Sequence, residues 1–177
     1  MASRLITIGG GCFWCIESVF SRTKGVSKAL SGYSGGNPKS ITYEEVCSGK
    51  TGHAEVVQIE YNPAIINTDK ILRVFFAIHD PTQLNRQGND IGTQYRSVVY
   101  YHDNEQKEVV ENLIKELDAS GTYKNKIVTE ITKFDKFFPA EDYHQKYFQN
   151  NPNQGYCQAV VRPKYEKFQK LFKDLFV

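Results

Sequence analysis

The chain lacks any long run of apolar residues, and this absence excludes several classes of protein. No segment approaches the roughly 20 apolar residues that a membrane-spanning helix needs. The first residues also lack the extended apolar core of a secretory signal peptide, so we expect a cytoplasmic protein. The formal net charge is only +2, which is too small to indicate a nucleic-acid partner or an anionic membrane surface.

Cysteine is sparse, and its spacing gives little support to a structural metal site. The four cysteines are Cys12, Cys15, Cys47 and Cys157. Structural zinc commonly takes two CxxC pairs, or one such pair with two closely spaced histidines. The chain has one CxxC and four scattered histidines, so we expect no metal and keep zinc only as an unsupported alternative. In a cytoplasmic protein, cysteines are more often reactive or simply buried than joined in structural disulfides.

The 177 residues are enough for one domain with a sizeable core, and apolar periodicity predicts its elements. We predict strands at 4–9, 54–61, 95–101 and 126–134. We predict helices starting near Cys12, within 67–81, and over 104–118, 142–150 and 164–176. Loops are predicted at 31–40, 83–94 and 151–157.

Strands and helices are interspersed without strict alternation, and no internal repeat is visible. This order predicts one α/β (α+β) domain over residues 1–177, with a mixed β-sheet and a packed helix layer. The lysines of 164–176 fit the solvated face of a core-packed helix better than a membrane-surface helix.

The stretch GCFWC at 11–15 carries the clearest chemical signal. Cys12 follows glycines at a predicted helix start, where unpaired backbone N–H groups favour a thiolate and would lower its pKa. Phe13 and Trp14, taken as large exposed aromatics, suggest a pocket for an apolar or methyl-bearing group. A Cys12–Cys15 disulfide is geometrically reasonable, because residues three apart on a helical turn lie near disulfide range. A thioredoxin-type dithiol and an inert buried thiol therefore stay open here.

Further segments appear in a fixed order along the chain: SGYSGG, TYEEVCSGKTGHAEVV, HDPTQLNRQGNDIGTQYRS, AEDYHQKYF and NPNQGYC. With GCFWC, they resemble the A-type peptide methionine sulfoxide reductases over roughly residues 5–162. The resemblance implies that family's α/β fold with a ferredoxin-like core. It also implies thiol-dependent reduction of methionine (S)-sulfoxide, free or in proteins, as a repair of oxidative damage.

The resemblance implies that Cys12 attacks the sulfoxide sulfur and becomes a sulfenic acid. It implies that Glu55 is the acid, with Tyr43 and Tyr95 as hydroxyl donors to the oxygen. A carboxyl group in that role needs a raised pKa, which burial among aromatic residues can supply. From the residues alone, Glu55 could equally lie on the outer face of its strand, and both tyrosines could simply pack.

The same resemblance assigns the substrate pocket. Phe13 and Trp14 match the apolar pocket for the S-methyl group, which disfavours the other epimer because its polar oxygen would face aromatic carbon. Asp90 and Tyr147 match further polar positions around the site. From the residues alone, Asp90 could only brace its loop and Tyr147 could only pack.

A sulfenic acid condenses with a second thiol to a disulfide. Cys157 matches the usual resolving position, in a segment expected to swing toward Cys12, and Cys15 is an additional candidate. Cys47 is interpreted as structural. We expect thioredoxin or another dithiol as reductant, no cofactor, and a monomer. A thiol–disulfide exchange protein and a non-catalytic binder of oxidised methionine peptides are the remaining alternatives.

Overall fold

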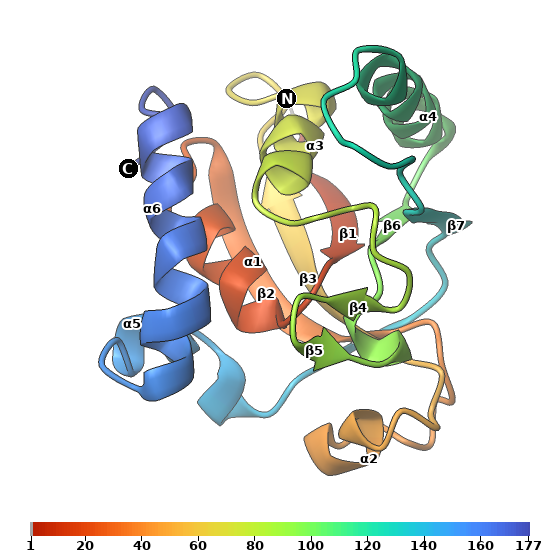
Figure 1. Ribbon diagram of the computed structural model, residues 1–177, viewed down its shortest axis with the longest axis vertical. Helices are drawn as coiled ribbons and strands as arrows, with labels where there is room; N and C mark the ends of the chain where they lie inside the picture. The colour runs from red at the N-terminus through yellow and green to blue at the C-terminus, as the bar shows by residue number, and fades with distance from the viewer. Residues whose placement is uncertain (1) are drawn as a thin grey trace.

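A six-stranded β-sheet organises the structure, a computed structural model that describes residues 2–177 (Figure 1). The strand order is β7-β6-β1-β3-β2-β8, with β6 and β7 parallel and the other neighbours antiparallel, so the predicted mixed sheet is confirmed. Its strands are β1 Arg4–Gly9, β2 Val26–Ser34, β3 Ala54–Tyr61, β6 Val98–Tyr101, β7 Glu130–Lys133 and β8 Phe137–Pro139. A separate two-stranded ribbon consists of β4 Arg86–Gln87 and β5 Asp90–Ile91.

The helices cover one face of this sheet, except for the second, which lies apart from the strands (Figure 1). They are α1 Phe13–Phe20, α2 Tyr43–Cys47, α3 Thr68–Ala77, α4 Asn104–Ala119, α5 Tyr147–Asn150 and α6 Arg162–Leu171. Helix α6 lies beside α1, and α3 lies beside α4 (Figure 1). No helix within residues 2–177 has both the length and the apolar character needed to cross a bilayer.

Alternation along the central strands separates two hydrophobic clusters. Ile6 of β1 lies opposite Ile59 of β3, and both belong to the large cluster that also contains apolar residues of α1, α3, α4 and α6. Val56 and Val98 belong to a smaller cluster on the other face. Because side chains alternate along a strand, Glu55 shares the helix-covered face with Val57 and Ile59.

Several predicted elements are confirmed, and their ends have local causes. The strand at 54–61 is β3, and the helices within 67–81 and over 104–118 are α3 and α4. Asn67 caps α3 by accepting the Lys70 N–H at 2.8 Å. Asp103 caps α4 by accepting the Gln106 N–H at 2.9 Å.

Other boundaries were predicted wrongly, and in the loops predicted at 31–40 and 83–94 the cause was that glycine was interpreted as a loop signal. Residues 31–34 are the end of β2, where β8 runs so close that a Cβ on Gly32 would lie 2.5 Å from the Phe138 carbonyl oxygen. The ribbon β4–β5 interrupts the predicted loop at 83–94, and a 3₁₀ turn at Thr93–Tyr95 delays the following strand to Val98. The strand predicted at 126–134 begins only at Glu130, and the last helix ends at Leu171.

The segment predicted as a helix at 142–150 is broken in two. A 3₁₀ turn covers Asp142–His144, and the single turn of α5 begins at Tyr147. The segment 151–157, predicted as a loop, already becomes helical at 155, and a π-helical turn at Cys157–Val161 leads into α6.

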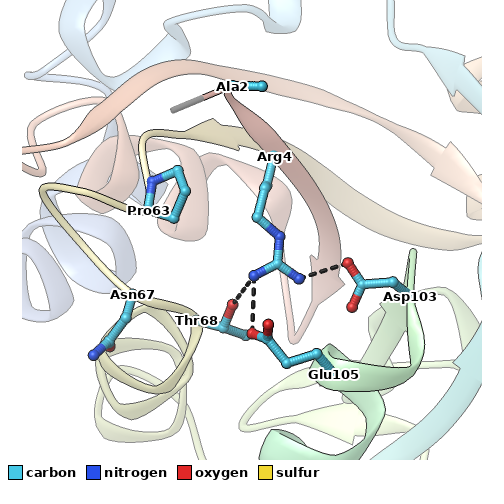
Figure 2. Close-up of a pocket in the computed structure, with 7 residues that line it drawn as sticks. All are labelled: Ala2, Arg4, Pro63, Asn67, Thr68, Asp103 and Glu105. Carbon is cyan, nitrogen blue, oxygen red and sulfur yellow. Dashed lines mark hydrogen bonds and ion pairs between the residues drawn. The ribbon is translucent and has the colours of Figure 1, made fainter.

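Arg4 ties the first strand to the starts of two helices in a hollow of about 600 Å³ (Figure 2). Its guanidinium donates to Thr68 Oγ1 of α3 at 3.4 Å and pairs with Glu105 at 2.9 Å and with Asp103 at 2.5 Å. None of the predicted site residues lines this hollow, and its charged residues Arg4, Asp103 and Glu105 pair with one another. We therefore interpret it as part of the framework rather than as the functional site.

Candidate active site

The glycine turn between β1 and α1 places Cys12 at the first turn of a helix. The Gly11 N–H donates to the Tyr95 carbonyl at 3.1 Å, which joins this turn to the 3₁₀ turn before β6. A Cβ on Gly10 would lie 2.6 Å from Cδ2 of His79, so only glycine allows the backbone to pass this ring. Cys12 is the N-cap residue of α1, with an extended backbone at φ −67° and ψ 133°.

Glu55 lies directly beneath this helix start. It is fully buried, and its Oε1 accepts the Phe13 N–H at 3.2 Å. The other carboxyl oxygen, Oε2, is buried without a hydrogen-bond partner. Burial raises the pKa of Glu55 to about 8, because the anion loses its hydration. The carboxyl group is therefore largely protonated at neutral pH.

Burial also governs the Cys12 thiol. Only 5% of this residue is exposed, and burial, followed by the charge of Glu55, raises the pKa of the thiol well above its usual range. The expectation that the helix start lowers this pKa is wrong, because lost hydration outweighs the favourable backbone N–H group of Trp14. Cys12 and Glu55 thus form a buried pair that disfavours a second negative charge.

Tyr43 and Tyr95 approach this pair from two different elements. Tyr43 opens α2, which begins after Thr42 accepts the Glu45 N–H at 3.2 Å. Burial raises the pKa of both phenols above the usual range, and the charge of Glu55 makes the second-largest contribution. Both hydroxyl groups therefore keep their protons and can donate hydrogen bonds, and the Tyr43 hydroxyl interacts with the Cys47 thiol.

Phe13 and Trp14, the residues after Cys12 on α1, pack against the rings of His144 and Tyr147. We call this group of rings the aromatic wall. The Trp14 ring, half-buried, stacks on Tyr147 with centroids 3.8 Å apart and planes 7° apart. Its Nε1–H donates to Nδ1 of His144 at 3.1 Å. Phe13 was expected to be exposed, and this is wrong: it is fully buried, with its ring centroid 5.2 Å from that of His144 and 5.7 Å from that of Tyr33.

The sequence analysis missed three residues of the site: Tyr156, Glu141 and His144. Asp90 of β5 accepts a hydrogen bond from the Tyr156 hydroxyl, and Tyr156 also meets Trp14 edge-on at 5.7 Å. Glu141 accepts the Tyr33 hydroxyl at 2.8 Å and the backbone N–H of Tyr43 at 3.0 Å, so it fixes the start of α2. His144 belongs to the same HQKY motif as the predicted Tyr147, and Tyr156 belongs to the same GYC motif as the predicted Cys157. Their place in these motifs was the signal from which they could have been found.

The remaining cysteines lie at different depths. Cys15 and Cys157 both belong to the main hydrophobic core, and all four cysteines are unpaired thiols. Burial raises the pKa of Cys15 to about 11, although the nearby Lys164 ammonium opposes this. Cys157 is fully buried in the π-helical turn, so its placement in a loop was wrong. Cys47, interpreted as structural, is exposed at the end of α2.

Within residues 2–177, no three His, Cys, Asp or Glu side chains are grouped closely enough to hold a metal ion. The zinc alternative therefore gains no support from the positions of the possible ligands. The site offers instead a buried thiol, a protonated carboxyl group, two phenol donors and an aromatic wall. This set of groups can deliver an electron pair and a proton to one small substrate group.

The chain is similar to known proteins along nearly its whole length. Residues 4–175 match the family model described as "Peptide methionine sulfoxide reductase". The "Peptide methionine sulfoxide reductase MsrA" of Polynucleobacter asymbioticus is 52% identical over 169 residues, covering 96% of this chain and 89% of the relative. Mxr1 from Saccharomyces cerevisiae in reduced form has a TM-score of 0.80 and 36% identity, covering 88% of this chain and 90% of Mxr1. Mxr1 in complex with Trx2 matches with a TM-score of 0.55 and 26% identity, covering 82% and 85%.

Proposed function

The chain belongs to the peptide methionine sulfoxide reductase family, and we propose that it reduces methionine (S)-sulfoxide with Cys12 as nucleophile and Glu55 as proton donor. The observation that carries this assignment is the buried Glu55 beside Cys12, with one carboxyl oxygen unpartnered and a pKa raised to about 8. A protonated acid with a free oxygen is what a leaving sulfoxide oxygen requires.

The proposed chemistry balances electrons and protons within the site. The Cys12 sulfur donates an electron pair to the sulfoxide sulfur, while the sulfoxide oxygen takes the proton of Glu55. The hydroxyl group so formed then moves from the substrate sulfur to the Cys12 sulfur, as the sulfur–oxygen bond of the substrate and the transient sulfur–sulfur bond both break. The sulfoxide is thereby reduced to a thioether and Cys12 is oxidised to a sulfenic acid. The proton that Cys12 gives up restores Glu55. Tyr43 and Tyr95 donate hydrogen bonds to the oxygen as its negative charge develops.

The aromatic wall gives a physical basis for substrate and epimer choice. Trp14 forms apolar surface for the S-methyl group, with the fully buried Phe13 packed behind it, and Tyr147 extends this surface through its stack on Trp14. The opposite epimer would turn its polar oxygen toward aromatic carbon, which costs free energy without a hydrogen bond. We place Asp90 at the polar edge of this pocket, because Tyr156 connects it to the same wall.

We propose that a second thiol then attacks the sulfenic acid, which releases water and forms a disulfide. Cys157 and Cys15 are the candidates, and both are buried in the core near α1. Since Cys157 is buried in a helical turn, its attack on Cys12 requires that turn to rearrange. Tryptic mapping after one turnover should find Cys12–Cys157. A Cys12–Cys15 disulfide that persists in the Cys157→Ser variant would assign the role to Cys15 instead.

We propose thioredoxin or a similar dithiol protein as the reductant of that disulfide. The support is the solved complex of the related Mxr1 with Trx2. The substrate is then methionine (S)-sulfoxide, free or in peptides, and no cofactor takes part in either half of the cycle. A monomeric protein in the cytoplasm stays a prediction from the sequence.

We also propose that residues 1–177 form one domain around a ferredoxin-like core. The support is the antiparallel strand order β6-β1-β3-β2, with α1 and α3 as the connections β1-α1-β2 and β3-α3-β6. The main hydrophobic cluster extends from Ile6 to Phe168, which favours a single folding unit. Limited proteolysis that releases two separately folded pieces would contradict it.

The experiment that tests the proposed reaction measures methionine formed from the separated S and R sulfoxides, with and without dithiol. We expect one equivalent from the S epimer without dithiol, continuous turnover with it, and no methionine from the R epimer. Cys12→Ser should abolish product. A thiol–disulfide exchange protein would instead reduce insulin without forming methionine, and a binder would retain substrate without either reaction. Turnover of the S epimer by Cys12→Ser would refute the proposal.

A further inference from the structure

Glu17 of α1 is a buried carboxylate that the proposed reaction does not use. Only 1% of this residue is exposed, although glutamate is almost never fully buried unless it is paired. Its Oε1 accepts the backbone N–H of Lys146 at 2.6 Å, which joins α1 to a segment 129 residues later in the chain. Burying a carboxylate costs free energy, so we expect the hydrogen bond between Glu17 and Lys146 to have a role in the structure or the function.

Lys146 has a backbone conformation that few residues other than glycine adopt. Its φ of 55° and ψ of 34° lie in the left-handed region, and it separates the 3₁₀ turn that ends at His144 from helix α5. The next residue is Tyr147, the first residue of α5 and the ring that stacks on Trp14. The bond to Glu17 therefore fixes the residue whose backbone angles direct Tyr147.

Helix α1 carries both residues that hold this segment, Glu17 and Trp14. Trp14 and Glu17 are three positions apart, so both project from the same side of the helix. Trp14 receives the Tyr147 ring and donates to His144, while Glu17 holds the backbone between those two residues. We infer that Glu17 is a positioning residue, which holds Tyr147 against Trp14 and so shapes the substrate wall. The inference rests on the proposed function in taking that wall as the substrate pocket.

The surroundings of Glu17 make this bond sensitive to pH. A hollow of about 330 Å³ beside it is lined by Lys28 of β2, Gln145 and Lys146, so the other charged residues of this hollow are both lysines. Burial raises the pKa of Glu17 to about 7, against the lowering effect of the Lys146 N–H and ammonium. Protonation below that pH removes the charge that strengthens the bond. His144 titrates lower, because burial lowers its pKa.

Trp14 is the only tryptophan of the chain, so its fluorescence reports on the wall directly. Glu17→Leu should shift the emission to longer wavelength, because the indole loses the stacked Tyr147 ring. The KM for a peptide with methionine (S)-sulfoxide should rise about tenfold with kcat changed less than about threefold, since binding is weakened and the reacting groups stay in place. Glu17→Gln keeps an oxygen acceptor and should restore emission and KM. The unsubstituted protein should show an emission change near pH 7, and Glu17→Gln should abolish it.

Gln106→Leu provides a matched control at the other end of the sheet. Gln106 is also buried, accepts the His102 N–H at 2.8 Å and donates to the Leu5 carbonyl at 2.9 Å. Its replacement should lower stability without moving Trp14 emission or KM. Tyr147→Leu combined with Glu17→Leu should raise KM no more than Tyr147→Leu alone, because both changes remove the same contact.

Unchanged emission and KM in Glu17→Leu, or additive effects with Tyr147→Leu, would overturn the inference. If Glu17→Leu does not fold, the glutamine variant decides, measured with Glu55→Gln in both proteins so that the Glu55 carboxyl, with its pKa of about 8, does not contribute. A pH transition in emission that persists there overturns the inference, and its loss supports it. These emission measurements need no turnover. Their failure is therefore distinct from failure of the proposed reaction, which Cys12→Ser tests.

Discussion

Replacing Glu55 by glutamine should slow sulfoxide reduction and, at the same time, make the Cys12 thiol easier to ionise. Glutamine keeps an oxygen that can accept the Phe13 N–H, so the start of α1 should stay in place. The variant loses the acidic proton, and it also loses the negative charge that helps to raise the pKa of Cys12. The substitution should therefore slow one reaction of the Cys12 sulfur, the reduction of sulfoxide, and accelerate another, its alkylation.

The size of the first effect follows from the protonation state of Glu55. With a pKa of about 8, roughly nine-tenths of this carboxyl group holds its proton at pH 7. A positioned general acid typically contributes about 10²–10⁴-fold to a rate. We therefore expect single-turnover formation of methionine from the S epimer to slow by about 10²–10⁴-fold, equivalent to about 2.7–5.5 kcal/mol of barrier.

The second effect is measured by alkylation of Cys12 at pH 9, where about nine-tenths of Glu55 is ionised in the unsubstituted protein. Alkylation should be faster in Glu55→Gln, because the thiolate no longer faces a carboxylate. Peptide mapping assigns the modified cysteine, and thermal unfolding controls for the new buried amide. A reduction rate within about threefold of the original, or alkylation that slows in parallel with reduction, would refute the reasoning.

Three further outcomes are expected. Tyr43→Phe and Tyr95→Phe should each slow single turnover about tenfold and together about 10²–10³-fold, since each removes one donor to the developing oxyanion; an unaffected double variant would contradict this. Gly10→Ala should lower the free energy of unfolding in urea by about 1–3 kcal/mol, because the added carbon meets the His79 ring, and equal stability would contradict that contact. Burial lowers the pKa of His79 to about 3, so the unfolded state binds one more proton as pH falls below about 6.5. Stability should therefore fall toward pH 3 by up to about 1.4 kcal/mol per pH unit, and His79→Gln should remove this part of the slope.

The elements best predicted from the sequence are those with strong local periodicity. The alternation in β3 and the amphipathic patterns of α3 and α4 placed these elements correctly, because burial of one face imposes a period of 2 or 3.6 on nearby residues. The predictions that failed depended on distant contacts. The end of β2 was interpreted as a loop, because the strand β8 that pairs with it lies more than 100 residues later.

The sequence by itself determined which residue types are available for the chemistry: Cys12 after a glycine turn, two aromatic residues next to it, and Glu55 in its strand. Whether Glu55 faced solvent or core was open, since alternation separates two sides of a strand but does not say which side the helices cover. The tertiary structure decided this, and with it the raised pKa values of Glu55 and Cys12, because hydration is lost only when distant segments close over a group. The bond from Glu17 to Lys146 has the same origin: it joins residues that only the folded chain brings together.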